Sequence, residues 1–191
     1  MELVFATNNA HKLREVKAIL GESINIISLK EAGVLDELPE NQDTLEGNAS
    51  EKAWYVYNKT GKDCFADDTG LEVEALDGRP GVYSARYAGE GKNSHDNVVK
   101  LLSELEGQRN RKARFRTVIS LIIGGTELLF DGTVEGDIIL KPAGGEGFGY
   151  DPVFLPQGFD QTFAEMSEEQ KNTISHRYRA VLSMKRFINR F

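Results

Sequence analysis

Two neighbouring carboxylates, Asp67 and Asp68, follow an apolar run in the stretch FADDTGLEVEAL, residues 65–76. A carboxylate placed this way can serve as a general base, and one or two carboxylates together with phosphate oxygens can hold Mg²⁺. The sequence Asp68-Thr69-Gly70 is therefore compatible with an aspartic protease, a magnesium site or an ordinary turn. The rest of the chain must distinguish between these three interpretations.

A second candidate is ATNNAHK, residues 6–12, where a predicted strand ends and a predicted helix begins. The first turn of a helix offers backbone N–H groups and the positive end of the helix dipole, which together favour phosphate. Thr7, Asn8 or Asn9 can cap this helix, and Lys12 can direct an ammonium group at a bound anion. An ordinary N-cap followed by a surface lysine explains the same residues.

A third candidate is the glycine-rich stretch KPAGGEGFGYDPVF, residues 141–154. Glycines let backbone N–H groups approach a ligand, and Phe148 or Tyr150 offers a face on which a base can stack. The stretch has neither the P-loop spacing nor the GxGxxG spacing of the common nucleotide fingerprints. A flexible loop with one anchoring aromatic residue is the alternative.

The fourth candidate is a basic cluster near the C-terminus that contains Lys171, His176 and Arg177. Ser175 is placed to cap the last helix, so His176 and Arg177 fall in its first turn. Cations are mildly unfavourable at that end of a helix dipole, and a polar or anionic ligand would compensate. An exposed basic turn is the alternative.

Composition limits the classes of protein to which the chain can belong. The 191 residues are 40% hydrophobic and 28% charged, as in an ordinary globular protein with one domain, or with two small lobes that share a core. The net charge of −7 argues against a nucleic-acid partner, and no apolar run is long enough to cross a membrane. The single cysteine, Cys64, and an N-terminus without signal-peptide features favour the cytoplasm.

Hydrophobic periodicity predicts strands alternating with amphipathic helices, which is the α/β class: a long mixed sheet with flanking helices. A hairpin turning at Gly124–Gly125 is the strongest β signal, and Ser167 to Gln170 matches a capping box. The predicted strands are 2–6, 24–29, 63–67, 71–75, 115–123 and 127–140, and the predicted helices are 9–20, 44–58, 94–105 and the C-terminal segment.

Together, ATNNAHK, FADDTGLEV with GRPGVYSARYAG, GFGYDPVF and SHR resemble the motifs of the inosine triphosphate pyrophosphatase family. The resemblance is collinear from Phe5 to the last helix and so covers nearly the whole chain. It implies two lobes with a central nucleotide cleft, a homodimer, and Mg²⁺-dependent hydrolysis of ITP, dITP and XTP to the monophosphate and pyrophosphate.

The resemblance also implies a role for individual residues. Asp68 would be the general base, and Glu40 and Asp68 would bind the metal. Substrate contacts would come from Thr7, Asn8, Asn9, Ala10, His11, Lys12, Lys52, Thr69, Phe148, Gly149, Tyr150, Asp151, Lys171, His176 and Arg177. Asn8 and His11 depart from the family pattern, in which glycine is frequent, although contacts through backbone N–H groups would survive that change.

Purine bases differ in the hydrogen-bonding group at position 6. Hypoxanthine and xanthine have an acceptor at position 6 where adenine has a donor, so His176, Arg177 and loop N–H groups would pair only with the former. The alternating helices exclude an all-β aspartic protease, whereas a nucleotide sensor without turnover stays open. Asp67 and Asp68 would point to opposite faces of a strand, with Gly70 providing a sharp turn.

Overall fold

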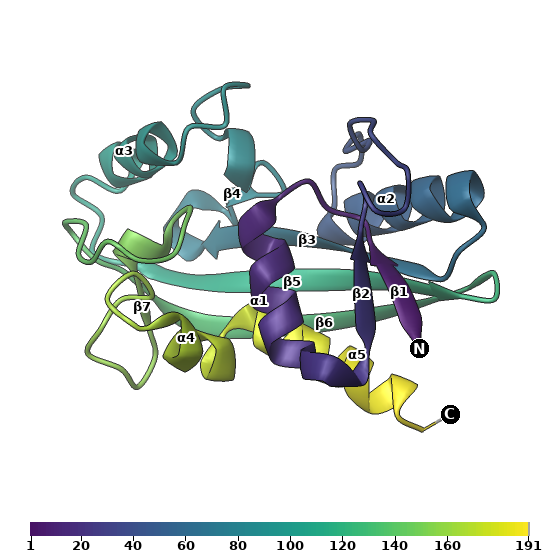
Figure 1. Cartoon of the computed structure of the whole chain (residues 1–191). Coiled ribbons are helices and arrows are strands. Elements are labelled where there is room, and N and C mark those ends of the chain that lie inside the picture. Colours follow the sequence, from purple (N-terminus) through teal and green to yellow (C-terminus); the bar gives the residue numbers. More distant parts are fainter. Residues whose placement is uncertain (191) are drawn as a thin grey trace. The chain divides into compact units, whose positions relative to one another are not determined.

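The computed structural model describes residues 1–190 and consists of strands alternating with helices (Figure 1). The strands are β1 Glu2–Phe5, β2 Asn25–Ser28, β3 Cys64–Val73, β4 Pro80–Gly81, β5 Lys112–Ile123, β6 Thr126–Ile138 and β7 Phe154–Pro156. The helices are α1 Ala10–Leu20, α2 Leu45–Thr60, α3 Ser94–Glu104, α4 Glu168–Ile174 and α5 His176–Ile188. None of these helices is both long enough and apolar enough to cross a membrane, within the residues described.

The strands form one mixed sheet in the order β2-β1-β3-β5-β6-β7, with β4 paired to β3 outside that path. Strand β1 pairs in parallel with β2 and β3, whereas β4 and β7 pair antiparallel with β3 and β6. Gly124 and Gly125 connect β5 to β6 with φ values of 55° and 79°, which suits the tight hairpin turn predicted there. The predicted class, a mixed sheet with flanking helices, is confirmed.

The chain divides into two compact units. Unit 1 consists of Met1–Asp68, Thr117–Gly132 and the C-terminal residues from Arg177 on, and unit 2 consists of Thr69–Arg116 and Thr133–His176. The strands β3, β5 and β6 each contribute residues to both units. The nucleotide cleft expected between two lobes stays a prediction.

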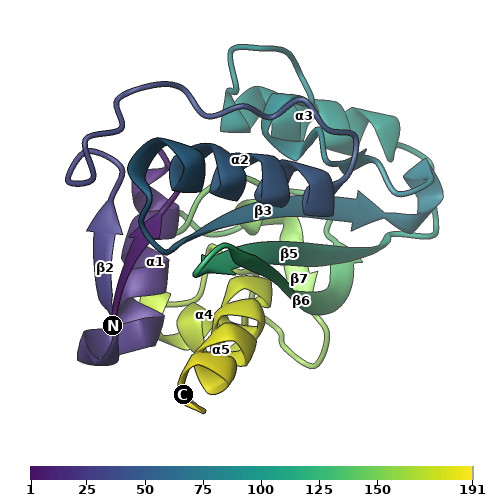
Figure 2. The same cartoon turned by 90° about the vertical axis from the view of Figure 1, so that its right-hand side faces the viewer.

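Unit 1 has a hydrophobic core on each face of its strands. Phe65 of β3 packs with Val16 of α1 and Val181 of α5. Ala66, the next residue of β3, belongs to the other core, together with Ala53 of α2. Figure 2 accordingly shows α2 on one side of the strands and α5 on the other. Because side chains alternate along a strand, the two faces of β3 are presented to different helices.

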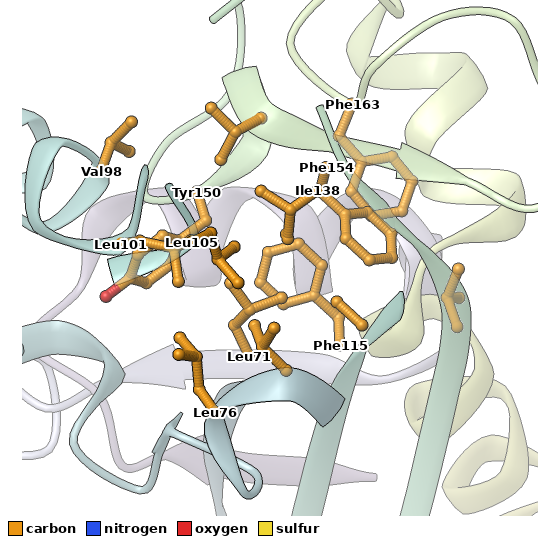
Figure 3. Close-up of a cluster of buried hydrophobic side chains, with 14 of the residues drawn as sticks. Leu71, Leu76, Val98, Leu101, Leu105, Phe115, Ile138, Tyr150, Phe154 and Phe163 are labelled. Carbon is orange, nitrogen blue, oxygen red and sulfur yellow. The ribbon is translucent and has the colours of Figure 1, made fainter. Parts of the chain in front are cut away.

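Unit 2 has a separate core in which aromatic residues predominate (Figure 3). Phe115 of β5 lies edge-on to Phe154 of β7, with ring centroids 4.6 Å apart, and Phe154 in turn contacts Phe163. Leu71 of β3 and Leu101 of α3 complete the same cluster. This core supports the start of β7 and the glycine-rich segment that precedes it.

The structure corrects the predicted ending of the strand at the two aspartates. Two short strands, 63–67 and 71–75, were expected with a sharp turn at Gly70, but β3 runs without interruption from Cys64 to Val73. Both carboxylates are buried and have cationic partners, so the chain has no need to turn toward water at this point. Gly70 is part of the extended strand, and the expectation of a turn there is wrong.

Candidate active site

Asp67 and Asp68 are directed to opposite faces of β3. Asp67 shares its face with Phe65, on the side of α1 and α5, and Asp68 shares its face with Ala66, on the side of α2. The partners of the two carboxylates differ accordingly, since Asp67 binds Lys12 whereas Asp68 binds Lys52. Two like charges are therefore adjacent in the sequence without sharing a site.

The carboxylate of Asp68 is held by two side chains from α2. Asn48 Nδ2 donates to Oδ2 over 3.3 Å, and Lys52 Nζ donates to Oδ1 over 3.3 Å. The two residues are one helical turn apart, so the helix presents both to the same group. Burial raises the pKa of Asp68 above its ordinary value, despite the opposing effect of Lys52. A carboxylate with a raised pKa that is still 8% exposed has the properties of a general base.

Lys52 has three acceptors around its ammonium group. Nζ lies 3.0 Å from Glu40 Oε1, 2.8 Å from the backbone oxygen of Asp67 and 3.3 Å from Asp68 Oδ1. Burial alone would lower the pKa of Lys52, but the carboxylates of Asp68 and Glu40 outweigh it and raise that pKa. The residue is therefore a buried cation that connects the two predicted metal ligands.

Asp67 lies at the centre of a second charged network. Its Oδ1 is 3.0 Å from Lys12 Nζ, and its Oδ2 is 3.2 Å from Arg177 Nε. Arg177 Nη1 also donates to the carboxylate of Glu15 on α1. Burial by itself would raise the pKa of Asp67, but the cations of Lys12 and Arg177 hold it well below its usual range. Asp67 is thus a permanent anion that ties α1 and α5 to β3.

Arg177 has surroundings that the sequence did not predict. A contact with the purine was expected, and the side chain is instead 1% exposed, with its guanidinium paired to Asp67 and Glu15. The base contact has not been tested and stays a prediction. The contacts described here favour a role in positioning Asp67, and through it Lys12.

The segment Thr7–Lys12 forms a capped start to α1. The side chain of Asn9 accepts hydrogen bonds from the backbone N–H groups of His11 and Lys12 at 2.9 and 3.2 Å. Thr7 Oγ1 accepts from the backbone N–H of Asn9. Asn8, Asn9, Ala10 and His11 are exposed, so the N-terminal end of the helix is open to solvent. An anion bound here would meet a positive helix end and the nearby ammonium group of Lys12.

The segment Phe148–Asp151 is organised by one buried carboxylate. Asp151 Oδ2 accepts from the backbone N–H of Phe148 at 2.9 Å and from Lys171 Nζ at 2.7 Å. Lys171 Nζ also lies 4.8 Å from the centre of the Phe148 ring. Gly147 has a φ of 73°, and a Cβ there would approach Asp151 Oδ2 to 2.2 Å, so this turn requires glycine. The result is a half-buried aromatic ring, beside the half-buried Gly149, on a fixed loop.

Three further predicted contact residues have different degrees of exposure. Tyr150 is buried, and its hydroxyl donates to the backbone oxygen of Ser84 over 2.7 Å. His176 is also buried, and its ring stacks on Phe115 with centroids 4.6 Å apart. Thr69 is half-buried on β3. Tyr150 and His176 therefore have core contacts, whereas Phe148 is more open to a ligand.

The structure thus brings together two groups of the predicted residues. In unit 1, Lys12 and Arg177 pair with Asp67 on one face of β3, and Lys52 pairs with Asp68 and Glu40 on the other. In unit 2, Phe148, Asp151 and Lys171 form the fixed loop. Each group is a compact set of contacts within its own unit.

The residues of unit 1 fit a magnesium ion that is bound together with phosphate. Among residues 1–190 there is no cluster of three or more His, Cys, Asp or Glu side chains that could hold a metal. Mg²⁺ commonly uses one or two carboxylates together with waters and substrate phosphates. Glu40 and Asp68 would therefore be enough protein ligands. Both carboxylates contact the same ammonium group, which shows that a cation is accommodated beside them.

A mixed α/β protein that sets a carboxylate, 12% exposed, beside a buried lysine, with a capped helix start in the same unit, is of the class that can bind and hydrolyse a polyphosphate. A sequence model of the Ham1 family matches residues 3–187 of this chain. The chain belongs to the Ham1 family, and the family resemblance recognised from its motifs is confirmed.

Relatives and solved structures agree over nearly the full length. The dITP/XTP pyrophosphatase of Flavobacterium johnsoniae is 55% identical over 181 residues, which cover 95% of this chain and 94% of the relative. The protein of the same name from Porphyromonas gingivalis is 53% identical and covers 98% and 97%. The structure of the Staphylococcus aureus Ham1 protein matches with a TM-score of 0.90 and 40% identity over 99% of this chain and 98% of that chain.

Two residues of the site were not predicted from the sequence. Glu15 is buried in α1 and binds Arg177, and Asn48 holds Asp68. Asp67 was a candidate from the sequence, but its contact with Lys12 was not predicted. Asn48 is four residues before Lys52, and this spacing on a helix was a usable signal. Nothing in the sequence distinguishes Glu15 from an exposed acidic residue of a surface helix, because its burial depends on tertiary contacts.

Proposed function

We propose that this protein hydrolyses non-standard purine nucleoside triphosphates, namely ITP, dITP and XTP, to the monophosphate and pyrophosphate, and so removes them from the nucleotide pool. The supporting observation is the setting of Asp68, a carboxylate with a raised pKa and a side chain that is 12% exposed, beside the buried ammonium of Lys52. Relatives named dITP/XTP pyrophosphatase at 53–55% identity supply the substrate class.

Each charged residue of unit 1 has a distinct part in this proposal. Asp68 accepts a proton from the attacking water, and Lys12 and Lys52 neutralise charge that develops on the triphosphate. Arg177 and Asp67 hold Lys12 in place. Glu40 and Asp68 would hold Mg²⁺, which when bound supplies Lewis-acid stabilisation of the phosphate oxygens.

The residues of unit 2 are proposed to bind the base. Phe148 stacks on the purine, and donors of the glycine-rich loop pair with its 6-carbonyl, which adenine lacks. Lys171 and Asp151 keep the ring and the loop in a fixed position. His176 stacks on Phe115 in the core of the same unit, and its predicted contact with the substrate is part of this proposal.

The decisive experiment measures pyrophosphate release from dITP, XTP, dATP and dGTP with and without Mg²⁺. The proposal predicts turnover of dITP and XTP that needs Mg²⁺ and exceeds turnover of dATP by orders of magnitude. Tight binding of dITP with no pyrophosphate release would instead indicate a nucleotide sensor. Equal rates on all four nucleotides would contradict the base selectivity.

We also propose that the protein is a cytoplasmic homodimer without a nucleic-acid or membrane partner. Support comes from the net charge of −7 and from the GRPGVYSARYAG stretch, where Tyr83 is 48% exposed. Aromatic and arginine side chains are enriched in protein interfaces. Light scattering at micromolar concentration tests this, and a monomeric mass would contradict it.

A further inference from the structure

One ammonium group contacts both carboxylates that are proposed to bind the metal. Lys52 Nζ lies 3.0 Å from Glu40 Oε1 and 3.3 Å from Asp68 Oδ1. The side chain of Lys52 is 5% exposed, so water screens this interaction little. The ammonium group of Lys52 therefore offsets part of the negative charge that Glu40 and Asp68 carry together.

The second lysine of the site is arranged differently. Lys12 Nζ pairs with Asp67 on the opposite face of β3, and Asp67 also binds Arg177. Lys12 thus belongs to a network in which its carboxylate has two cations. Lys52 has the reverse arrangement, in which one cation serves two carboxylates and also the backbone oxygen of Asp67.

We propose that Lys52 is a built-in competitor of the metal: its ammonium group occupies Glu40 and Asp68 until a triphosphate draws it away. The inference rests on the proposed function, because it takes these carboxylates to be the metal ligands. The anionic phosphates offer Lys52 a second partner, and the released carboxylates can then bind Mg²⁺. Metal and nucleotide binding are thereby coupled, and such coupling is reciprocal.

This arrangement has a consequence for specificity of the reaction. If Mg²⁺ bound tightly beside the general base without a nucleotide, the catalytic site would be assembled before any substrate is present. A lysine that competes with the metal keeps the affinity for free Mg²⁺ low. When a triphosphate draws this lysine away, the affinity of the two carboxylates for Mg²⁺ rises. The substrate therefore completes its own catalytic site.

The test is calorimetric titration of Mg²⁺ into the nucleotide-free protein and two matched variants. Lys52→Met removes the competing ammonium group and should tighten Mg²⁺ binding by about tenfold or more, because two neighbouring carboxylates in a poorly screened site lose their cation. Lys52→Arg retains the charge and should bind Mg²⁺ as weakly as the wild type. Lys171→Met removes an equally buried ammonium group whose carboxylate partner is Asp151, and it should leave the affinity unchanged.

A double variant locates the effect. Combining Lys52→Met with Glu40→Gln should abolish the gain, since one of the two released carboxylates is then missing. An Mg²⁺ affinity of Lys52→Met equal to or weaker than that of the wild type overturns the inference. A tightening that persists in the double variant also overturns it, because the gain would then arise elsewhere.

Two further results complete the design. If Lys52→Met is unfolded without metal, the competition predicts that millimolar Mg²⁺ restores its far-UV circular dichroism, and failure to do so overturns the inference. The proposed function is judged separately by the wild type. Hydrolysis of dITP that is equally fast in EDTA would reject the magnesium role itself, whereas Mg²⁺-dependent hydrolysis without tighter binding by Lys52→Met rejects only the competition.

Discussion

The two units each contain a lysine buried against a carboxylate, yet the two ion pairs differ in what surrounds them. In unit 1, Lys52 binds Asp68 and Glu40, whose side chains are 12% and 32% exposed. In unit 2, Lys171 binds Asp151, and both side chains are 4% exposed. A ligand can therefore reach the carboxylates of the first pair, whereas the second pair is enclosed and holds Phe148.

The difference separates chemistry from support. Carboxylates that solvent can partly reach can exchange a lysine for another cation. Asp68 is nevertheless buried enough for its pKa to be raised. An enclosed ion pair cannot exchange partners without a large penalty, so it serves to fix geometry. Substitutions in unit 1 should accordingly change turnover, and substitutions in unit 2 should change the binding of the base.

The largest effect is expected for Asp68→Asn. Loss of a general base lowers kcat by about 10²–10⁴-fold, and loss of a metal ligand adds to this. Folding and nucleotide binding should be retained, as measured by circular dichroism and by titration of an ITP analogue. Turnover like that of the wild type at saturating Mg²⁺ would remove Asp68 from its assigned role. Asp36→Asn, at an exposed carboxylate that binds Lys59, is the matched control.

The next effect concerns stability rather than catalysis. Arg177→Met takes the cation from two buried carboxylates, and breaking a buried pair this way costs about 3–5 kcal/mol. Urea unfolding should show this loss, and Arg114→Met, which breaks the more exposed pair with Glu72, should cost about 0–1 kcal/mol. A normally stable Arg177→Met variant that loses activity on ITP while its ATP activity is unchanged would support the predicted contact of Arg177 with the base.

A smaller and more uniform effect is expected for Phe148→Ala. Removing a stacking contact costs about 1–3 kcal/mol and does not depend on the identity of the base. The kcat/KM values for ITP, XTP and GTP should all fall by similar factors, mainly through KM. A loss confined to one base would show that Phe148 selects among purines instead of binding them all. Phe159→Ala, at an exposed ring, is the control.

The last effect is confined to acid solution and concerns the pH dependence of stability through Asp67. Its pKa is lowered in the folded protein, so the unfolded chain binds the proton first. The stabilisation is fully present when the pH is above the pKa of the unfolded chain, near 3.9. As the pH falls below this value, the stabilisation decreases by at most about 1.4 kcal/mol per pH unit, until the pH reaches the pKa of the folded protein. The difference in unfolding free energy between the wild type and Asp67→Asn should be constant at neutral pH and shrink in acid. A difference that does not change with pH would contradict the assignment.

Much of the fold could be predicted because it depends on local patterns. The apolar residues of α1, α2 and α3 recur at helical spacing, and the Gly124–Gly125 hairpin carries its own turn signal, so all four were confirmed within a few residues. The continuity of β3 could not be predicted. Its polar centre resembles a turn until the partners from α1, α2 and α5 are in place.

The sequence by itself determined the class of fold, the family and the two carboxylates around which the site is built, because these depend on spacing and on the order of short motifs. It also indicated that Asp67 and Asp68 point apart, since alternation along a strand needs no knowledge of partners. Only the tertiary structure decided what each carboxylate meets. One face of β3 meets Lys12 and Arg177, and Glu15 binds the latter. The other face meets Asn48 and Lys52, and Glu40 binds the latter. Both sets come together through packing between segments that are distant in the sequence. The same packing makes Arg177 a buried partner of two acids, which the sequence did not indicate, because the energy of a buried charge depends on neighbours that no local pattern specifies.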